Sequence, residues 1–220
     1  MDIGSNNVDA LINQCWDLVK NKVEVGSQPV SSEKTLVFLF AMELIHKVGK
    51  NLIIDFENQC YGDISGESTY LDLLFYTDRS FQVAIEFKFP TGTPDQKDTR
   101  KKIYRDIGRL NYLKAEAGMN ACYFLMATNV VAFLNPGKYR NYPEMGVAHD
   151  HAINSQNNIE VDGIPLWGVE VKFKWDNIKE KANKNKEIRK FALDGRYAWL
   201  MPVKVYRSSS LIINAQLMAP

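Results

Sequence analysis

Residues 70–89 read YLDLLFYTDRSFQVAIEFKF, two apolar runs on either side of a polar turn around Arg79. Short runs rich in aromatic and β-branched residues that flank a turn are typical of a β-hairpin. In a hairpin centred on Arg79, residues whose numbers sum to 158 face one another, so Asp72 lies opposite Glu86. The stretch therefore predicts two antiparallel strands in a defined register.

The two faces of this hairpin differ in chemistry. Side chains alternate between the faces of a strand, so one face receives a set of apolar residues that can pack on a helix and fix the register. These are Leu71, Leu73, Phe75, Val83, Ile85 and Phe87. The opposite face carries Asp72, Glu86 and Lys88.

The opposed carboxylates predict a metal site. Directly opposed residues have Cβ atoms ~5 Å apart, and two unit negative charges at that distance repel by about 3 kcal/mol at an effective dielectric constant of about 20. A divalent cation between Asp72 and Glu86 reverses the sign, and Mg²⁺ typically takes one or two protein carboxylates and leaves its other positions to water and substrate phosphate. Lys88 points to the same side, where it can orient or deprotonate an attacking water or neutralise transition-state charge. We expect Mg²⁺ there, with Mn²⁺ as a substitute.

Glu-x-Lys alone is a weak signal, because Glu170-Val171-Lys172 repeats it without a carboxylate across an obvious hairpin. The alternative is that Lys88 simply forms an ion pair with a carboxylate on a solvated sheet face. The opposed Asp72 and the apolar reverse face favour the metal site.

Helical spacing of apolar residues predicts two helices before the hairpin. The first is capped by Ser5 and ends near Gly26, and the second begins at Ser31 or Ser32 and ends at Gly49. The stretch 36–44 of the second helix is apolar on nearly every face, so we expect it to be buried.

The rest of the core follows in a regular order. We expect three antiparallel strands at 51–59, 70–76 and 81–89, then a helix over 95–117 and a strand at 120–128. The order is α-β-β-β-α-β, an α/β fold with a central mixed sheet flanked by helices.

The C-terminal part is expected to elaborate this core within a single domain spanning 1–220. Residues 135–163 lack periodicity and predict a long surface loop. A strand at 166–175, a Lys-rich helix at 178–191 and an aromatic strand at 196–206 should follow.

Composition limits the function classes. Of 220 residues, 45% are hydrophobic and 24% charged, which argues against intrinsic disorder. The net charge is only +1, so attraction to a polyanion must come from local clusters of Lys and Arg. Three widely spaced cysteines predict reduced thiols, and the polar N-terminus has no signal-peptide pattern. We expect a soluble, cytoplasmic protein without a membrane partner.

Asp72 in one strand, Ile85-Glu86-Phe87-Lys88 at the end of the next, and Ser32-Glu33 opening a helix together resemble the PD-(D/E)XK nuclease superfamily. The match covers about residues 31–128, and Leu71 stands in place of the name-giving proline. The resemblance implies a restriction-endonuclease-like core and Mg²⁺-dependent hydrolysis of nucleic-acid phosphodiesters. Asp72 and Glu86 would be metal ligands and Lys88 the catalytic lysine.

The resemblance also implies supporting residues. A helix-borne acid completes the metal site in the family, and Glu33 matches it better than Glu43 or Glu57. Glu33 can equally serve the helix dipole in the first turn, and Glu43 can pair with Lys47.

Two further basic clusters are candidates for nucleic-acid contact. Several basic residues give the helix at 95–117 a face suited to a phosphate backbone, with Lys101 and Arg105 as the favoured contacts and a solvated face as the alternative. These residues are Lys97, Arg100, Lys101, Lys102, Arg105 and Arg109. The Lys-rich run at 179–190 reads as a solvated face with some affinity for nucleic acid. His149 and His151 lack a third ligand at metal spacing.

Two function hypotheses follow. The first is a metal-dependent endonuclease acting on nucleic acid, DNA foremost, in restriction, defence or repair, with a homodimer suited to cutting both strands. The second is a catalytically inactive nucleic-acid-binding or interaction protein on the same fold.

Overall fold

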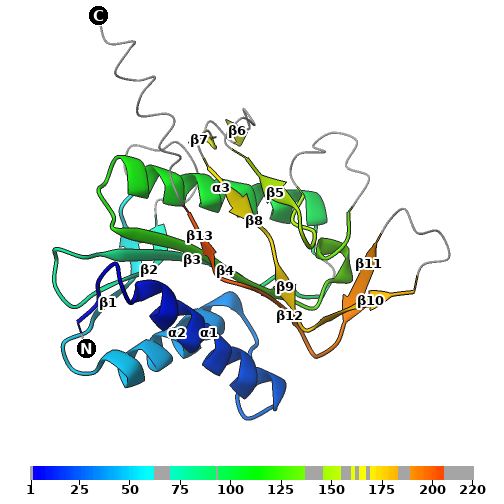
Figure 1. Cartoon of the computed structure of the whole chain (residues 1–220), viewed down its shortest axis with the longest axis horizontal. Helices are drawn as coiled ribbons and strands as arrows, with labels where there is room; N and C mark the ends of the chain where they lie inside the picture. Colours follow the sequence, from blue (N-terminus) through cyan, green and yellow to red (C-terminus); the bar gives the residue numbers. More distant parts are fainter. Residues whose placement is uncertain are drawn as a thin grey trace, which may run out of the picture.

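The computed structural model has a mixed sheet at its centre with helices on both faces (Figure 1). It describes the chain in eight stretches: residues 2–61, 70–92, 94–136, 146–154, 160–161, 164–166, 169–182 and 189–205. No helix within these stretches is both long and apolar enough to cross a membrane.

Helices α1 (Val8–Glu24) and α2 (Glu33–Val48) form one layer. α2 begins and ends as predicted, because Ser32 Oγ accepts from Thr35 N and Gly49 adopts a positive φ of 89° after the last turn. α1 is capped at Asn7 and not at Ser5. The expectation that 36–44 is buried all round is wrong for Phe38, whose exposed fraction is 57%, since the sheet covers only one side of the helix.

The sheet contains the predicted strands β1 (Ile53–Gln59), β2 (Tyr70–Tyr76), β3 (Val83–Lys88) and β4 (Ala121–Thr128) in this order. β1, β2 and β3 are antiparallel neighbours, whereas β3 and β4 are parallel. The β3–β4 connection crosses over through α3 (Gln96–Ala115), which makes the sheet mixed.

The sheet is extended beyond β4 by short C-terminal strands. β12 (Ala198–Leu200) and β13 (Val203–Lys204) pair with β4, and β9 (Trp175–Asp176) pairs with β12. Trp16 Nε1 on α1 donates to Leu200 O (2.8 Å), which ties the first helix to this distant strand.

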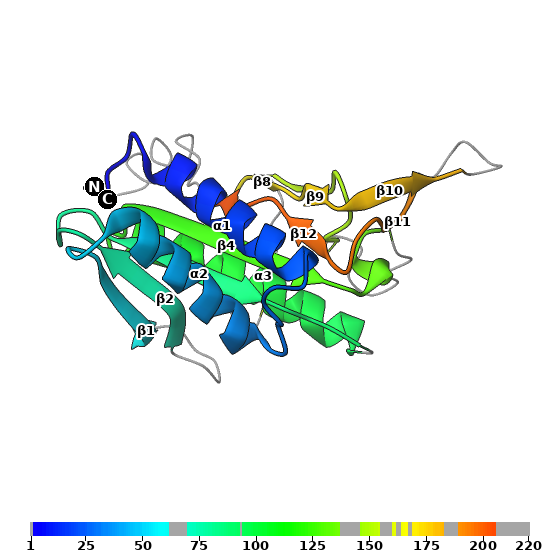
Figure 2. The same ribbon diagram turned by 90° about the horizontal axis from the view of Figure 1, so that it is seen from below.

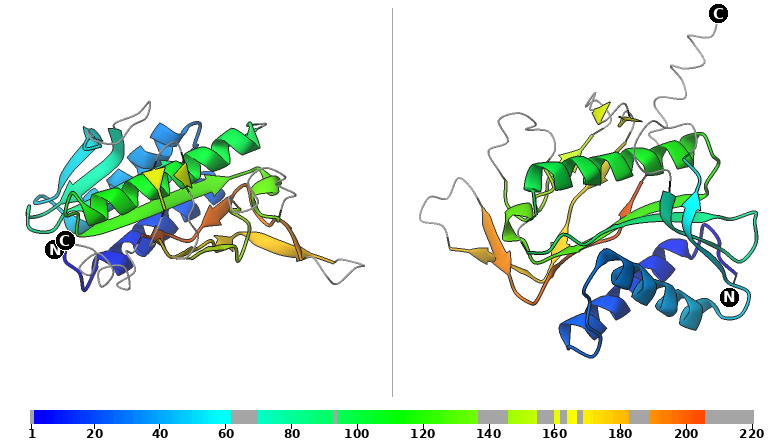
Figure 3. Two further views of the ribbon diagram at one scale, coloured as in Figure 1. Left: turned by 90° about the horizontal axis from the view of Figure 1, so that it is seen from above. Right: turned by 180° about the vertical axis from the view of Figure 1, so that it is seen from behind.

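Each face of the sheet has its own apolar cluster, since α1 and α2 cover one face and α3 covers the other (Figure 3). On the α1–α2 side, the ring of Phe87 lies 5.5 Å from that of Phe40 and 6.3 Å from that of Trp16, centroid to centroid. The α3 side contains Ile103, Ile107 and Leu110, the residues whose spacing predicted that helix, together with alternate side chains of β4. Both faces of β3 are therefore buried.

The C-terminal strand and helix expected from the sequence differ from the structure. The strand expected at 166–175 is broken among its described residues, which include β8 (Val171–Lys172) and the first residue of β9. The helix expected at 178–191 is wrong, because β10 (Ile178–Lys181) and β11 (Lys190–Leu193) form an antiparallel hairpin. Phe191 and Leu193 pack on the core with a period of two, which overrides the helical preference of the lysines.

The segment expected as a surface loop is also partly in the core. Val147 and Ile153 are buried, so the expectation of a surface position is wrong there. Beyond the short helix η1 (Val131–Phe133), this segment contributes β5 (Ala152–Ile153), which pairs with β8, and β6 (Glu160–Val161), which pairs with β7 (Ile164–Pro165).

Candidate functional site

The candidate site lies where β2 and β3 diverge. The backbone ladder pairs Leu73 with Ile85 and Leu74 with Ala84, which confirms the predicted register. Beyond Leu73 the Asp72 side chain replaces the backbone as acceptor, since its Oδ2 takes a hydrogen bond from Phe87 N (2.7 Å). The carboxylate thus fills the gap between the two strands.

The edge strand is irregular at the same level. Glu57 would lie opposite Asp72 in the β1–β2 register, but Glu57 has a positive φ of 53° and the pairing skips it. One consequence is that Leu71 packs in the cluster under α3 and not with Leu73 and Phe75, so its predicted face is wrong. The strict alternation of faces ends where the ladders end.

Asp72 and Glu86 meet as predicted. The Asp72 carboxylate lies close enough for its negative charge to contribute to the raised pKa of Glu86, and Tyr61 Oη donates to Glu86 Oε1 (2.7 Å). Burial and the negative charges of Asp106 and Asp72 raise the pKa of Glu86 well above its ordinary value. Burial and the neighbouring Glu86 also raise the pKa of Tyr61. The folded chain therefore favours the protonated form of Glu86.

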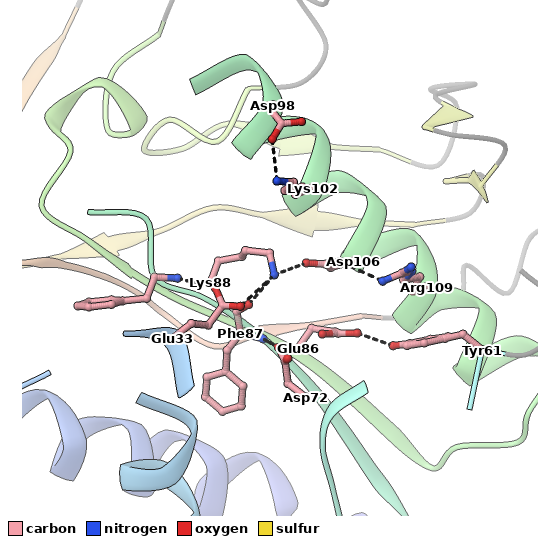
Figure 4. A network of polar contacts seen from close by, with 11 residues as sticks. Glu33, Tyr61, Asp72, Glu86, Phe87, Lys88, Asp98, Lys102, Asp106 and Arg109 are labelled. Carbon is pink, nitrogen blue, oxygen red and sulfur yellow. Dashed lines mark hydrogen bonds and ion pairs between the residues drawn. The ribbon is translucent and has the colours of Figure 1, made fainter. Parts of the chain in front are cut away.

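Lys88 lies beside this pair and between two further acids (Figure 4). Its Nζ is 2.7 Å from Asp106 Oδ2 and 3.5 Å from Glu33 Oε1, and it donates to Phe87 O (2.9 Å). Burial alone would lower the pKa of Lys88, but Asp106 and Glu33 outweigh it and raise that pKa. The ammonium group therefore stays charged at neutral pH.

Glu33 is brought to the site by the start of α2. Its Oε2 accepts from Phe89 N (3.0 Å), just after the end of β3. Burial raises the pKa of Glu33, although Lys88 opposes the shift. The predicted helix-borne acid thus lies next to Lys88, and its contacts are with Lys88 and the backbone of Phe89.

Asp106 on α3 is the member of the site that the sequence prediction missed. Its side chain is 3% exposed and lies 3.8 Å from Arg109 Nη1. The Arg109 guanidinium lies over the Tyr61 ring, 5.1 Å from its centroid, which closes a loop of contacts back to Glu86. Asp106 lies within the apolar stripe of α3, between Ile103 and Ile107, and an acid in a buried stripe is the signal that could have found it.

The charges at the site do not balance. Four carboxyl groups, those of Glu33, Asp72, Glu86 and Asp106, surround the single ammonium group of Lys88 and the guanidinium of Arg109. No group of three or more Asp, Glu, His or Cys side chains in the described stretches is arranged to hold a metal ion.

The other predicted acids lie apart from the site. Glu43 is buried and pairs with Lys22 of α1, not with Lys47. Glu57 forms an exposed ion pair with Lys34 (2.7 Å). Of the three candidate acids, only Glu33 contacts Lys88.

The basic face predicted for α3 is only partly solvent-facing. Arg100 and Arg109 are buried, so their predicted place on a phosphate-binding face is wrong. Arg100 Nη2 donates to Ala132 O (2.9 Å), because the helix is packed against η1 there. Lys101 and Arg105 are half-buried, and their contact with nucleic acid stays a prediction.

His149 and His151, in the segment that was expected to be a surface loop, contact other residues of the fold. His149 Nδ1 accepts from Trp175 N (3.1 Å), and His151 Nε2 lies 3.2 Å from Tyr104 Oη. These contacts fix the segment after η1 against the core.

Comparisons of the chain with family models, with curated proteins and with solved structures give no match. The resemblance to the PD-(D/E)XK superfamily therefore depends on the residues and the order of elements, and remains a prediction.

Proposed function

We propose that the protein is a metal-dependent nuclease that hydrolyses phosphodiester bonds of nucleic acid, with DNA as the favoured substrate. The observation that carries this proposal is the pair of neighbouring carboxyl groups, Asp72 and Glu86, beside the charged Lys88 at the point where two strands diverge. The α-β-β-β-α-β order with a parallel β3–β4 pair supports a restriction-endonuclease-like core.

The residues at the site fit a divalent cation. Glu86 is buried beside the negative charges of Asp106 and Asp72, which raise its pKa, and a metal ion would offset these charges in place of a proton. Two carboxylates match the number that Mg²⁺ typically takes from protein, with water and substrate phosphate at its other positions. Mg²⁺, or Mn²⁺ in its place, would supply Lewis-acid stabilisation of the phosphate and a more acidic water.

Lys88 acts in this proposal as a fixed positive charge. Because its pKa is raised, it is a poor base and does not deprotonate the water. Its ammonium group can instead donate to a phosphate oxygen and offset the negative charge that develops in the transition state. Asp106 and Glu33 position the ammonium group for this role.

The test is a cleavage assay on single- and double-stranded DNA and RNA with Mg²⁺, Mn²⁺ or EDTA. We expect cleavage only with metal, and a loss of at least about a hundredfold in Glu86→Gln. Glu57→Gln is the matched control, because it also neutralises a glutamate near the β1–β2 edge but outside the site. Absence of cleavage on every substrate, together with no shift of the melting temperature by metal, would refute the proposal.

A binding protein without catalysis is the second candidate. Metal-independent binding of nucleic acid without cleavage would support it. The same set of substrates therefore distinguishes the nuclease from the binding protein.

A further inference from the structure

The hairpin of β10 and β11 extends away from the body of the protein (Figure 2). It is attached at the end of the sheet where β3 and β4 end. Asn135, which follows η1, holds its base, since Asn135 Nδ2 donates to Phe191 O (3.0 Å) and Phe191 N donates to Asn135 Oδ1 (2.6 Å). η1 comes directly after β4, whose Met126 is the parallel partner of Lys88. The hairpin and the candidate site therefore share one end of the sheet.

One face of this hairpin is used to hold it in place. Phe191 is buried in the core under α3, and Glu180 lies opposite it on the same face. Arg189 binds Glu180 through two hydrogen bonds of 3.1 and 2.9 Å and lies 4.0 Å from Asp150. These contacts satisfy the charges on the inner face.

The other face is basic and solvent-exposed. It carries Lys179, Lys181 and Lys190, of which Lys179 pairs with Asp194 (3.2 Å). Lys181 and Lys190 are directly opposed in the register, and neither has an ion pair within the described stretches. Like charges directly opposed across a β-ladder destabilise it, so an isolated hairpin gains nothing from this pair. An anion between the two lysines removes the repulsion.

We propose that the outer face of the β10–β11 hairpin is an arm that binds the phosphate backbone of a DNA duplex. The inference depends on the proposed function for the identity of the partner. Lys181 and Lys190 would each neutralise a phosphate, in the same way that the opposed Asp72 and Glu86 on the other hairpin would hold a cation.

The geometry favours a duplex over a small anion. The lysine pair is exposed on a projecting ribbon, so it can reach a large partner, whereas a small anion would gain little there against water. A two-stranded ribbon also fits the major groove of a duplex. Because the arm begins at the end of the sheet that carries Lys88, a duplex bound along it extends toward the site.

The test measures binding of a short fluorescein-labelled DNA duplex by anisotropy at several salt concentrations, in EDTA so that no cleavage occurs. Each phosphate contact contributes about 0.9 to the slope of log K against log salt. We expect Lys181→Gln/Lys190→Gln to reduce the slope by ~1.8 relative to the wild-type chain. Lys47→Gln/Lys50→Gln, which removes two exposed lysines at the other end of the sheet, should leave it unchanged.

Two results of the salt titration would overturn the inference: an unchanged slope in the hairpin variant, or an equal fall of the slope in the control variant. It would also be overturned if the hairpin variant lost binding to phosphatidylserine vesicles but kept its binding to the duplex. A melting temperature at or above that of wild type verifies that the hairpin variant is folded. The result of the binding assay can be interpreted independently of the cleavage assay. A reduced slope, with no cleavage and no shift of the melting temperature by metal, would refute the nuclease and support the arm. Cleavage with an unchanged slope would support the nuclease and refute the arm.

Discussion

Replacing Lys88 with methionine removes the ammonium group that contacts Asp106 and Glu33 in the acidic site. Methionine is also unbranched and is one atom shorter, so the change is mainly the loss of the charged end. Lys88 Nζ lies 2.7 Å from Asp106 Oδ2, and the exposed fractions of the two side chains are 17% and 3%. At an effective dielectric constant of about 20, unit charges at this distance attract by ~6 kcal/mol. Desolvation of both ions offsets part of this attraction.

The expected loss follows from what remains after the substitution. Breaking a buried pair leaves an uncompensated charge and typically costs about 3–5 kcal/mol. For a domain of this size that corresponds to a fall in melting temperature of roughly 6–20 °C. We expect this loss for Lys88→Met at neutral pH in EDTA, measured by urea unfolding and thermal melts.

A double-mutant cycle assigns the loss to the pair. Lys88→Met/Asp106→Asn should recover much of the stability, because the orphaned carboxylate is gone. Lys34 and Glu57 provide the matched control, since they lie at the same 2.7 Å but have side chains 84% and 62% exposed. The Lys34→Met/Glu57→Gln cycle should give a far smaller coupling. If the coupling of the buried pair is no larger than that of the exposed pair, the reasoning about this site is wrong.

Two further predictions concern the proton and the hydrogen bond at Glu86. The pKa of Glu86 in the folded state is raised above its ordinary value near 4.5. The metal-free protein should therefore lose stability as the pH rises from about 4.5 through the folded-state pKa. The loss is at most ~1.4 kcal/mol per pH unit. Melts in EDTA between about pH 5 and 8 should show this slope in wild type, and a slope in Glu86→Gln as steep as in wild type would contradict the assignment of the proton. Tyr61→Phe removes the donor to a buried acceptor (2.7 Å) and should cost about 1–3 kcal/mol. Urea unfolding at neutral pH checks this, and an unchanged midpoint would show that the hydrogen bond does not stabilise the fold.

The hairpin was predictable because its signals are local. A short polar turn around Arg79 and apolar residues with a period of two leave one register that buries the apolar face. The structure has that register, and Asp72 and Glu86 meet as it requires. The start of α2 was equally local, since Ser32 caps the helix and thereby sets the position of Glu33.

The contribution of α3 was not predictable in the same way. Asp106 is one charged residue among many on a 20-residue helix. The side of the helix that carries Asp106 faces Lys88 because α3 lies on the crossover between β3 and β4. The same helix has two arginines that the sequence places with the surface lysines and the structure buries. Charge alone does not tell a buried arginine from a solvated one, because the partner atoms come from elements far along the chain.

The wrong helix at 178–191 has a related cause. Lysine and glutamate favour a helix when packing does not decide, and the hairpin exists because Phe191 is held by Asn135 and packs in the core under α3. That contact joins residues far apart in sequence, and no pattern within the segment reports it.

The irregularity at Asp72 connects the fold to the proposed chemistry. A continuous β1–β2–β3 ladder would place backbone groups where the Asp72 carboxylate now accepts from Phe87 N. The positive φ of Glu57 interrupts the ladder at that level, so Asp72 is free to turn toward Glu86. The carboxyl pair then lies on the face that α3 covers, where burial raises the pKa of Glu86. Burial and the nearby negative charges raise this pKa, so under the proposed function a divalent ion would compete with the Glu86 proton. A divalent ion that displaces this proton should therefore stabilise the fold more strongly as the pH rises.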